Sequence, residues 1–143
     1  MSDYEGALEA VDRILNRESE ADEVLRRVVD VLHDRFDHYS WVGIYLVEGD
    51  DLVLGPWKGP QATEHVRIPV GQGICGAAAA SGQTEIVVPI AYLGRVVGEI
   101  DIDSDEPAAF GPADRAFLER VALLISAHSL VGWDTGGVAW PDL

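Results

Sequence analysis

Two aspartates separated by a single residue are the clearest candidates for chemistry in this chain. Asp101 and Asp103 alternate within "GEIDID", a strand pattern, so both carboxylates should point to one face of a sheet. Glu85 begins the preceding apolar run, and we expect it on the partner strand, within reach of that face. Like charges this close repel unless one is protonated or a cation lies between them. The pattern favours a positively charged group, such as a ligand ammonium; the alternative is a solvated strand end.

The only cysteine, Cys75, lies in "VGQGICGAAAA", which also contains the glycine pattern G-x-G-x-x-G. A dinucleotide-binding loop joins a parallel strand to a helix, whereas the strands that follow here form a hairpin and Pro69 interrupts the preceding strand. We therefore predict a tight turn into a short helix over 73–81. The helix dipole would favour a Cys75 thiolate, while the surrounding alanines favour a buried thiol. A reactive and a structural cysteine both remain open.

The histidines do not form a metal-binding pattern, since none of the four has H-x-x-x-H spacing to another. The segment "DIDSDE" also lacks the glycine and the glutamate that an EF-hand loop requires for calcium. We therefore predict no metal and no cofactor, although a loosely held cation at these carboxylates stays open.

Hydrophobic spacing predicts the elements that must position these residues. Helices are expected over 3–17, 21–36 and 110–129, and the first two should pack on a sheet. Strands are expected over 41–47 and 52–57 as a hairpin and within 66–70, followed by a second hairpin that turns at Leu93-Gly94. The second hairpin is apolar, which places it in the middle of the sheet. The order predicts an α+β fold, a largely antiparallel central sheet flanked by N- and C-terminal helices.

Length and composition limit the class of protein. The 143 residues suit one domain, expected over 1–131, with a C-terminal tail over 132–143. No apolar run is long enough to span a bilayer, and the acidic N-terminus does not read as a signal peptide. One cysteine cannot form an internal disulfide, so a cytoplasmic location is expected.

Charge is the strongest compositional signal, because 25 acidic residues against 10 basic ones give a formal net charge of -15. Such an acidic surface repels nucleic acid and anionic membranes, so neither is an expected partner. Lys58 is the only lysine, and an acidic surface poor in lysine suits molar salt, where repulsion is screened. The composition therefore predicts a halophilic protein; an ordinary acidic soluble domain is the alternative.

Four sequence blocks, taken in order, resemble the GAF domain of free methionine-(R)-sulfoxide reductases, in a haloarchaeal-like form. They are "WVGIYLVEGDDLVLGPWKG", "VRIPVGQGICGAAAASGQT", "EIVVPI" and "GEIDIDSDEPAAF". The resemblance implies a GAF-like fold with a pocket beside the sheet for free methionine sulfoxide. It also implies that Trp41 and Tyr45 line the pocket, while Glu85, Asp101 and Asp103 hold the amino group and the sulfoxide oxygen.

The cysteine set departs from the family pattern, in which one cysteine attacks the sulfoxide sulfur and a second resolves the sulfenic acid as a disulfide. Cys75 matches the cysteine of the family's "G-[IV]-C-G" block, which is generally not the attacking one. The attacking cysteine usually lies between the "SGxT" and "SEIVVP" blocks, and here "SGQT" runs directly into "EIVVPI". This shortened lid segment leaves a chain that cannot complete two-cysteine chemistry by itself.

We therefore expect a GAF module that binds a small, amino-acid-like molecule. One alternative is an active L-methionine (R)-S-oxide reductase that uses Cys75 with an external thiol reductant, such as a thioredoxin-like protein. Another is a structural GAF module whose outer helices pair in a homodimer.

Overall fold

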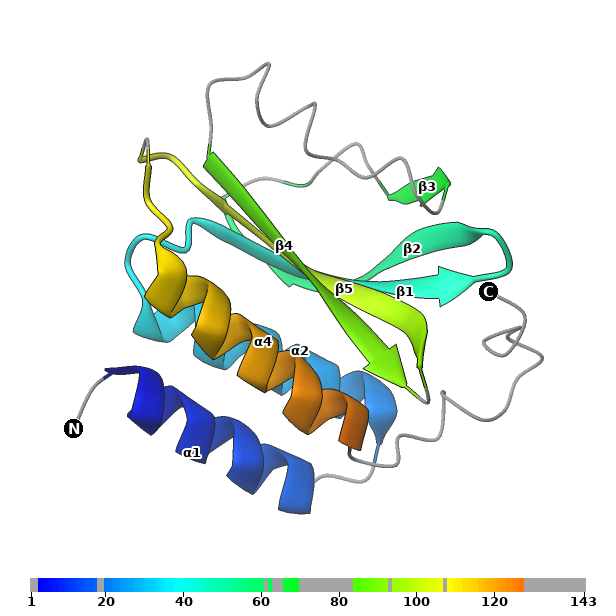
Figure 1. Ribbon diagram of the computed structural model, residues 1–143, viewed down its shortest axis with the longest axis horizontal. Coiled ribbons are helices and arrows are strands. Elements are labelled where there is room, and N and C mark those ends of the chain that lie inside the picture. Colours follow the sequence, from blue (N-terminus) through cyan, green and yellow to red (C-terminus); the bar gives the residue numbers. More distant parts are fainter. Residues whose placement is uncertain are drawn as a thin grey trace.

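The computed structural model describes residues 3–17, 20–60, 62, 66–69, 84–92, 94–106 and 108–127. Three helices and five strands lie in these ranges: α1 (Asp3–Arg17), α2 (Ala21–Arg35), β1 (Trp41–Glu48), β2 (Asp51–Lys58), β3 (Arg67–Pro69), β4 (Thr84–Tyr92), β5 (Arg95–Ser104) and α4 (Pro112–Ala127). The strands form one antiparallel sheet in the order β3-β2-β1-β5-β4. Helices α2 and α4 lie on one side of it (Figure 1). The predicted α+β fold, an antiparallel sheet with N- and C-terminal helices, is confirmed.

Helix α1 forms a second layer rather than packing on the sheet. It contacts α2 and α4, whereas α2 contacts β1 and β2 (Figure 1). The prediction that both N-terminal helices pack on the sheet is therefore right for α2 and wrong for α1. The physical reason is space, because α2 and α4 already cover that side of the sheet and leave α1 to bury its apolar stripe against them. That stripe contains Ala7, Ala10, Val11 and Leu15.

The second hairpin is placed differently from the prediction, because β5 is central while β4 is an edge of the described sheet. Ile86, Val88 and Ile90 of β4 are buried, and this strand contacts α4, whereas Pro89 is exposed. The apolar residues of β4 are therefore explained by helix α4, which covers one face of this strand, and not by neighbouring strands on both of its edges. A proline suits an edge, since it removes a backbone donor that a further strand would need.

Helix α4 begins at Pro112, two residues after the predicted start. Proline is favoured in the first turn because its fixed φ suits a helix and its missing N–H would have no partner there. The predicted helix over 73–81 and the C-terminal tail lie outside the described residues. None of the described helices is long and apolar enough to cross a membrane.

A buried carboxylate on α4 ties the helical layer to the chain entering β1. Asp114 accepts hydrogen bonds from the Tyr39 hydroxyl at 2.7 Å, the Tyr4 hydroxyl at 3.1 Å and the Gly111 backbone N–H at 3.0 Å. The Nε2 atom of His38 also lies 3.0 Å from its Oδ1. Three of these partners belong to a cluster of rings from four segments that contact one another: Tyr4, Phe36, His38, Tyr39, Phe110 and Phe117. Asp114 is therefore a structural anchor that joins α1, α4 and the α2–β1 connection.

Burial alone would raise the pKa of the Asp114 carboxyl, but these hydrogen bonds outweigh burial and hold the pKa below its ordinary value. A carboxyl whose pKa is lower in the folded state stabilises the fold above its unfolded pKa. That contribution is lost as pH falls through the folded-state pKa, so the loss of stability occurs below about pH 4.

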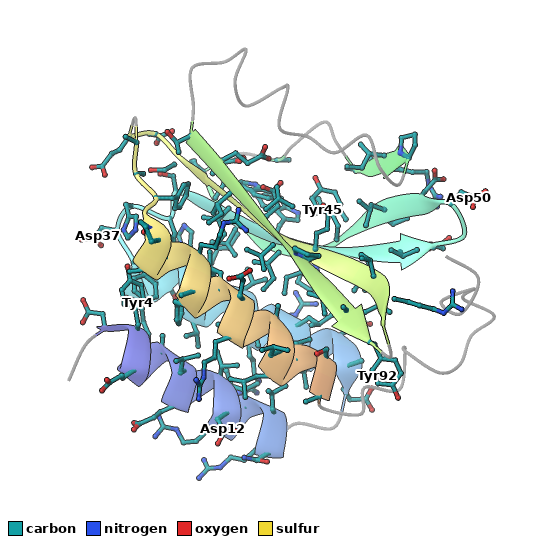
Figure 2. All side chains as sticks on the ribbon, in the orientation of Figure 1. Tyr4, Asp12, Asp37, Tyr45, Asp50 and Tyr92 are labelled. Carbon is teal, nitrogen blue, oxygen red and sulfur yellow. The ribbon has the colours of Figure 1, made fainter. Side chains whose placement is uncertain are left out.

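Replacing Asp114 with Asn should lower the free energy of unfolding by about 2–3 kcal/mol at pH 7, because a charged acceptor is lost. The difference from wild type should shrink on acidification below about pH 4, where the native carboxyl is also protonated. Urea denaturation followed by circular dichroism at both pH values measures this. Asp12→Asn is the control, since Asp12 is exposed on the outer side of α1 (Figure 2). Equal losses in the two variants would contradict the anchoring role.

Candidate functional site

The alternation of side chains along β5 separates the core from the candidate site. Ile100 and Ile102 are fully buried and pair with Ile44 and Val42 of β1, on the face that α2 and α4 cover. Asp101 and the residues in register with it must therefore point to the opposite face.

Cross-strand register brings the predicted ligand residues together on that opposite face. Asp103 lies directly across from Trp41 on one side and from Glu85 on the other. Tyr45 lies across from Glu99, on the side of the sheet away from the helices (Figure 2). All five predicted ligand residues thus share one face: Trp41, Tyr45, Glu85, Asp101 and Asp103.

Three carboxylates converge at the centre of this face and form what we call the carboxylate cluster: Glu85, Asp101 and Asp103. One oxygen from each lies within 4.8 Å of the other two. Asp101 has 0% relative exposure. While Glu85 and Asp103 are both ionised, neither oxygen of Asp101 has a hydrogen-bond partner within the part of the chain that the structure describes. No lysine, arginine or histidine of the described ranges forms an ion pair with the cluster. The cluster is therefore a buried concentration of negative charge that requires a proton or a cation.

Burial and mutual repulsion shift the cluster toward its protonated form. Burial raises the pKa of Asp101 well above its ordinary range, and a hydrogen bond with Glu85 and the charges of Glu85, Asp103 and Glu99 raise it further. Such a carboxyl–carboxyl hydrogen bond exists only when one partner carries a proton. Burial, and then the charge of Glu85, raise the pKa of Asp103 to about 7. Around neutral pH the ligand-free cluster therefore holds at least one proton.

An aromatic wall stands beside the cluster, built on two glycines. A Cβ atom at Gly43 would lie 2.3 Å from Cη2 of Trp41, and one at Gly59 would lie 2.4 Å from its Cδ1. The indole thus lies directly against backbone that must carry no side chain. Trp57, which pairs with Gly43 in register, stacks on Trp41 with ring centroids 6.1 Å apart and an interplanar angle of 15°.

Tyr45 completes the aromatic surface, since it is fully buried on this face. Burial raises the pKa of its hydroxyl, and the negative charge of Asp101 and Asp103 raises it further. Tyr45 therefore stays a neutral phenol that can donate a hydrogen bond.

Sequence reasoning missed Trp57 and Glu99, which share the site face. The sequence contained a pattern that could have identified each of them. Glu99 continues the alternation of Asp103 and Asp101, and Trp57 lies on the returning strand of the first hairpin, which pairs with β1. The predicted catalytic residue, Cys75, lies outside the described residues, so its role stays a prediction.

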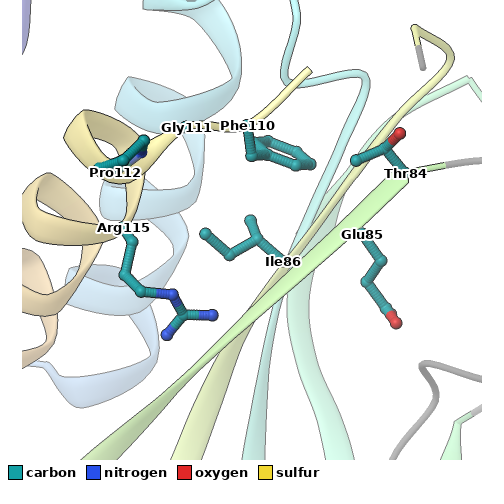
Figure 3. Close-up of a pocket in the computed structure, with 7 residues that line it drawn as sticks. All are labelled: Thr84, Glu85, Ile86, Phe110, Gly111, Pro112 and Arg115. Carbon is teal, nitrogen blue, oxygen red and sulfur yellow. The ribbon is translucent and has the colours of Figure 1, made fainter. Parts of the chain in front are cut away.

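A cavity of about 470 Å³ lies between the first residues of β4 and the first turn of α4 (Figure 3). Ile86, Phe110 and Arg115 line it together with Glu85, whose side chain leaves β4 in another direction from that of Ile86 (Figure 3). Glu85 therefore belongs both to the lining of this cavity and to the carboxylate cluster.

No family model matches the chain, but individual proteins do. GAF domain-containing protein A of Dictyostelium discoideum is 29% identical over 85% of this chain and 89% of its own length. The free methionine-R-sulfoxide reductase of Escherichia coli strain K12 is 35% identical over 64% of this chain and 67% of that protein. The structure of the Neisseria meningitidis free methionine-R-sulfoxide reductase, solved in complex with its substrate, is 32% identical, covers 87% of both chains and has a TM-score of 0.75.

The antiparallel sheet, its helical cover and these similarities define a GAF-domain protein. Within that class, the chain belongs to the GAF-fold family that includes the free methionine-R-sulfoxide reductases. The resemblance noted in the sequence is confirmed at this level.

Replacing Gly43 with Ala should displace the Trp41 indole and disrupt its stacking on Trp57, because the new Cβ would overlap the ring. We expect a changed near-ultraviolet circular dichroism spectrum and a loss of about 1–3 kcal/mol in stability. Gly111→Ala is the control, since a Cβ there meets nothing within 4 Å. An unchanged aromatic spectrum in Gly43→Ala would show that the indole does not rest on this glycine.

Replacing Asp101 with Asn should stabilise the protein at neutral pH. The folded-state pKa of Asp101 is raised, so above its unfolded pKa the native state must hold a proton that the unfolded chain releases. This cost is absent below about pH 4 and grows as pH rises, and an amide avoids it. We expect a gain of about 1–3 kcal/mol at pH 8 and little change at pH 4, measured by urea denaturation. A loss of stability at pH 8 would show that donors satisfy this carboxylate.

Proposed function

We propose that this chain is a ligand-binding GAF domain that takes a small amino-acid-like molecule, with free methionine sulfoxide as the first candidate. The observation that carries the proposal is the burial of Asp101 beside Glu85 and Asp103, without a cationic partner among the described residues. An α-ammonium group offers one positive charge and three N–H donors, which match three converging carboxylates. The names of the relatives support methionine sulfoxide as the ligand to test first.

The two sides of the site suit the two ends of such a ligand. Trp41 and Tyr45 offer apolar surface to a side chain with a methyl group. A sulfoxide oxygen only accepts hydrogen bonds, so a carboxyl that contacts it must be protonated. The raised pKa of Asp103 or Asp101 would supply that proton without a separate donor.

We propose further that residues 1–131 form one GAF domain followed by a tail, and that the protein is halophilic and cytoplasmic. The support is compositional: the formal net charge of -15 and the single lysine suit molar salt, and the single cysteine cannot form an internal disulfide. Binding and activity should therefore be measured in molar KCl, which screens the repulsion between acidic side chains.

A second candidate function is an active reductase, which the names of the relatives favour. The Cys75 thiolate would attack the sulfoxide sulfur while a protonated carboxyl gives its one proton to the oxygen, which passes to the cysteine sulfur. The products are methionine and a cysteine sulfenic acid, and an external dithiol then reduces the sulfenic acid, releasing water and its own disulfide. No second cysteine of this chain is needed.

Isothermal titration calorimetry with free L-methionine-(R)-sulfoxide in molar KCl tests the proposed binding. Asp103→Asn should weaken binding at least about tenfold, because a charge-assisted contact to the ammonium is lost. Asp50→Asn, in the exposed β1–β2 turn (Figure 2), is the matched control and should bind as wild type does. Binding that is equal in all three proteins would place the ligand elsewhere.

The same preparations separate the candidate functions when a dithiol is added and loss of the sulfoxide is followed. Cys75→Ala should retain binding under both functions, and should abolish turnover only if the protein is a reductase. Folded protein that neither binds nor reduces methionine sulfoxide would contradict both and favour a structural role, such as a homodimer formed by the outer helices.

A further inference from the structure

The cavity between β4 and α4 is a candidate binding site in addition to the face that holds the carboxylate cluster. Its volume of about 470 Å³ lies within the range that is usual for sites of small molecules. The apolar side chains of Ile86, Phe110 and Pro112 line it (Figure 3). The guanidinium of Arg115 projects from α4 toward Ile86 on the opposite wall (Figure 3). We propose that this cavity binds a small monocarboxylate with an apolar body.

Arg115 supplies the positive charge that such a ligand requires. It forms no ion pair within the described ranges, although the chain has 25 acidic residues against 10 basic ones. Arg67, by contrast, is held between the carboxylates of Glu48 and Asp51. A guanidinium presents its N–H donors in a planar fork that matches the two oxygens of a carboxylate. Arg115 can therefore bind a ligand carboxylate without giving up a carboxylate of the described chain.

Thr84 offers a second hydrogen-bond donor in the lining of the same cavity. Its Oγ1 atom accepts the backbone N–H of Ala108 at 3.1 Å. A threonine hydroxyl also carries one hydrogen of its own, and no acceptor among the described residues takes it. Because the guanidinium and this hydroxyl can both donate, the cavity suits an acceptor such as a carboxylate oxygen.

The hydrogen bond between Thr84 and Ala108 also fixes the shape of the cavity. Ala108 has a φ of 54°, in the left-handed region that is unfavourable for a residue with a Cβ atom. The bond ties the β5–α4 connection, which carries Phe110, to the first residue of β4. Ile86 on the strand is held in the core. The apolar walls are therefore in place before a ligand arrives, which lowers the entropic cost of binding.

The charges around the cavity favour a ligand with a single negative charge. Among the described residues that line it, Arg115 is the only cationic side chain and Glu85 is the only acidic one. The chain as a whole also has a formal net charge of -15. A phosphate monoester carries a charge of about -1.5 to -2 near pH 7, more than one guanidinium neutralises. A carboxylate carries one charge, and its apolar body can lie against Ile86 and Phe110.

Benzoate tests the proposal, because it joins one carboxylate to an apolar ring. Titration of the full chain in molar KCl, which screens the repulsion of an anion, should give saturable ¹⁵N–¹H NMR shifts at Thr84, Ile86 and Phe110. Benzamide has the same shape without the charge and should bind at least about tenfold more weakly, since charge-assisted hydrogen bonds are the stronger ones. Inorganic phosphate should also bind more weakly. The proposal is overturned by an absence of saturable shifts with benzoate, or by binding of benzamide or phosphate that is equally tight.

Variants of two arginines on α4 locate the carboxylate. Arg115→Gln should weaken benzoate binding at least about tenfold and remove the preference for benzoate over benzamide. Arg120→Gln is the matched control and should change binding less than twofold, because Arg120 is also exposed on α4 but does not line the cavity. Thr84→Val should weaken binding, whereas Thr84→Ser, which keeps the hydroxyl, should bind as wild type does. Equal effects of the two arginine variants would contradict a site at the cavity.

Calorimetry with methionine sulfoxide on the same variants separates this site from the proposed function. Arg115→Gln should bind methionine sulfoxide as wild type does, although Glu85 belongs to the lining of the cavity as well as to the cluster. Loss of that binding would overturn a separate site and assign Arg115 to the carboxylate of the amino acid itself. Wild type that binds benzoate but no methionine sulfoxide supports the cavity site and contradicts the proposed function alone.

Discussion

The alternation of side chains along β5 is the constraint on which both the core and the site depend. Ile100 and Ile102 fill the space under α2 and α4, and this leaves Asp101 and Asp103 no place except the opposite face. A shift of one residue in register would send the carboxylates into the core and the isoleucines into the site. The hydrophobic core therefore holds the carboxylates in position, although no core residue needs to touch a ligand.

Two buried aspartates illustrate how this fold treats anchoring and binding differently. Asp114 is surrounded by hydrogen-bond donors from three segments, and its pKa is lowered. Asp101 is at least as buried, has acidic neighbours in place of donors among the described residues, and its pKa is raised. The first arrangement stabilises the folded chain by itself. The second is unfavourable until something else enters, which is a common property of binding sites and a rare one of structural carboxylates.

Much of this arrangement could be predicted because it depends on local spacing. The helical period over 3–17 gives α1 its observed bounds, and the alternation of Asp101 and Asp103 correctly places both on one face. What could not be predicted depends on contacts between distant segments. The second-layer position of α1 follows from the space that α2 and α4 occupy. The edge position of β4 follows from strand order, which a run of apolar residues does not specify. The Asp114 anchor joins residues more than seventy positions apart, so no local sequence pattern predicts it.

The packing of Trp41 against two glycines restricts the order in which mutations can accumulate at this site. Gly43 is in β1 and Gly59 follows β2, so one indole governs two positions on different segments. A mutation that adds a methyl group at either glycine is costly while the tryptophan is present, and becomes acceptable once a smaller side chain stands at 41. Replacement of Trp41 by a smaller residue must therefore come first. Once either glycine has been replaced, a tryptophan can no longer be accommodated at position 41. Descendants of this chain should keep all three residues together or lose the tryptophan before either glycine.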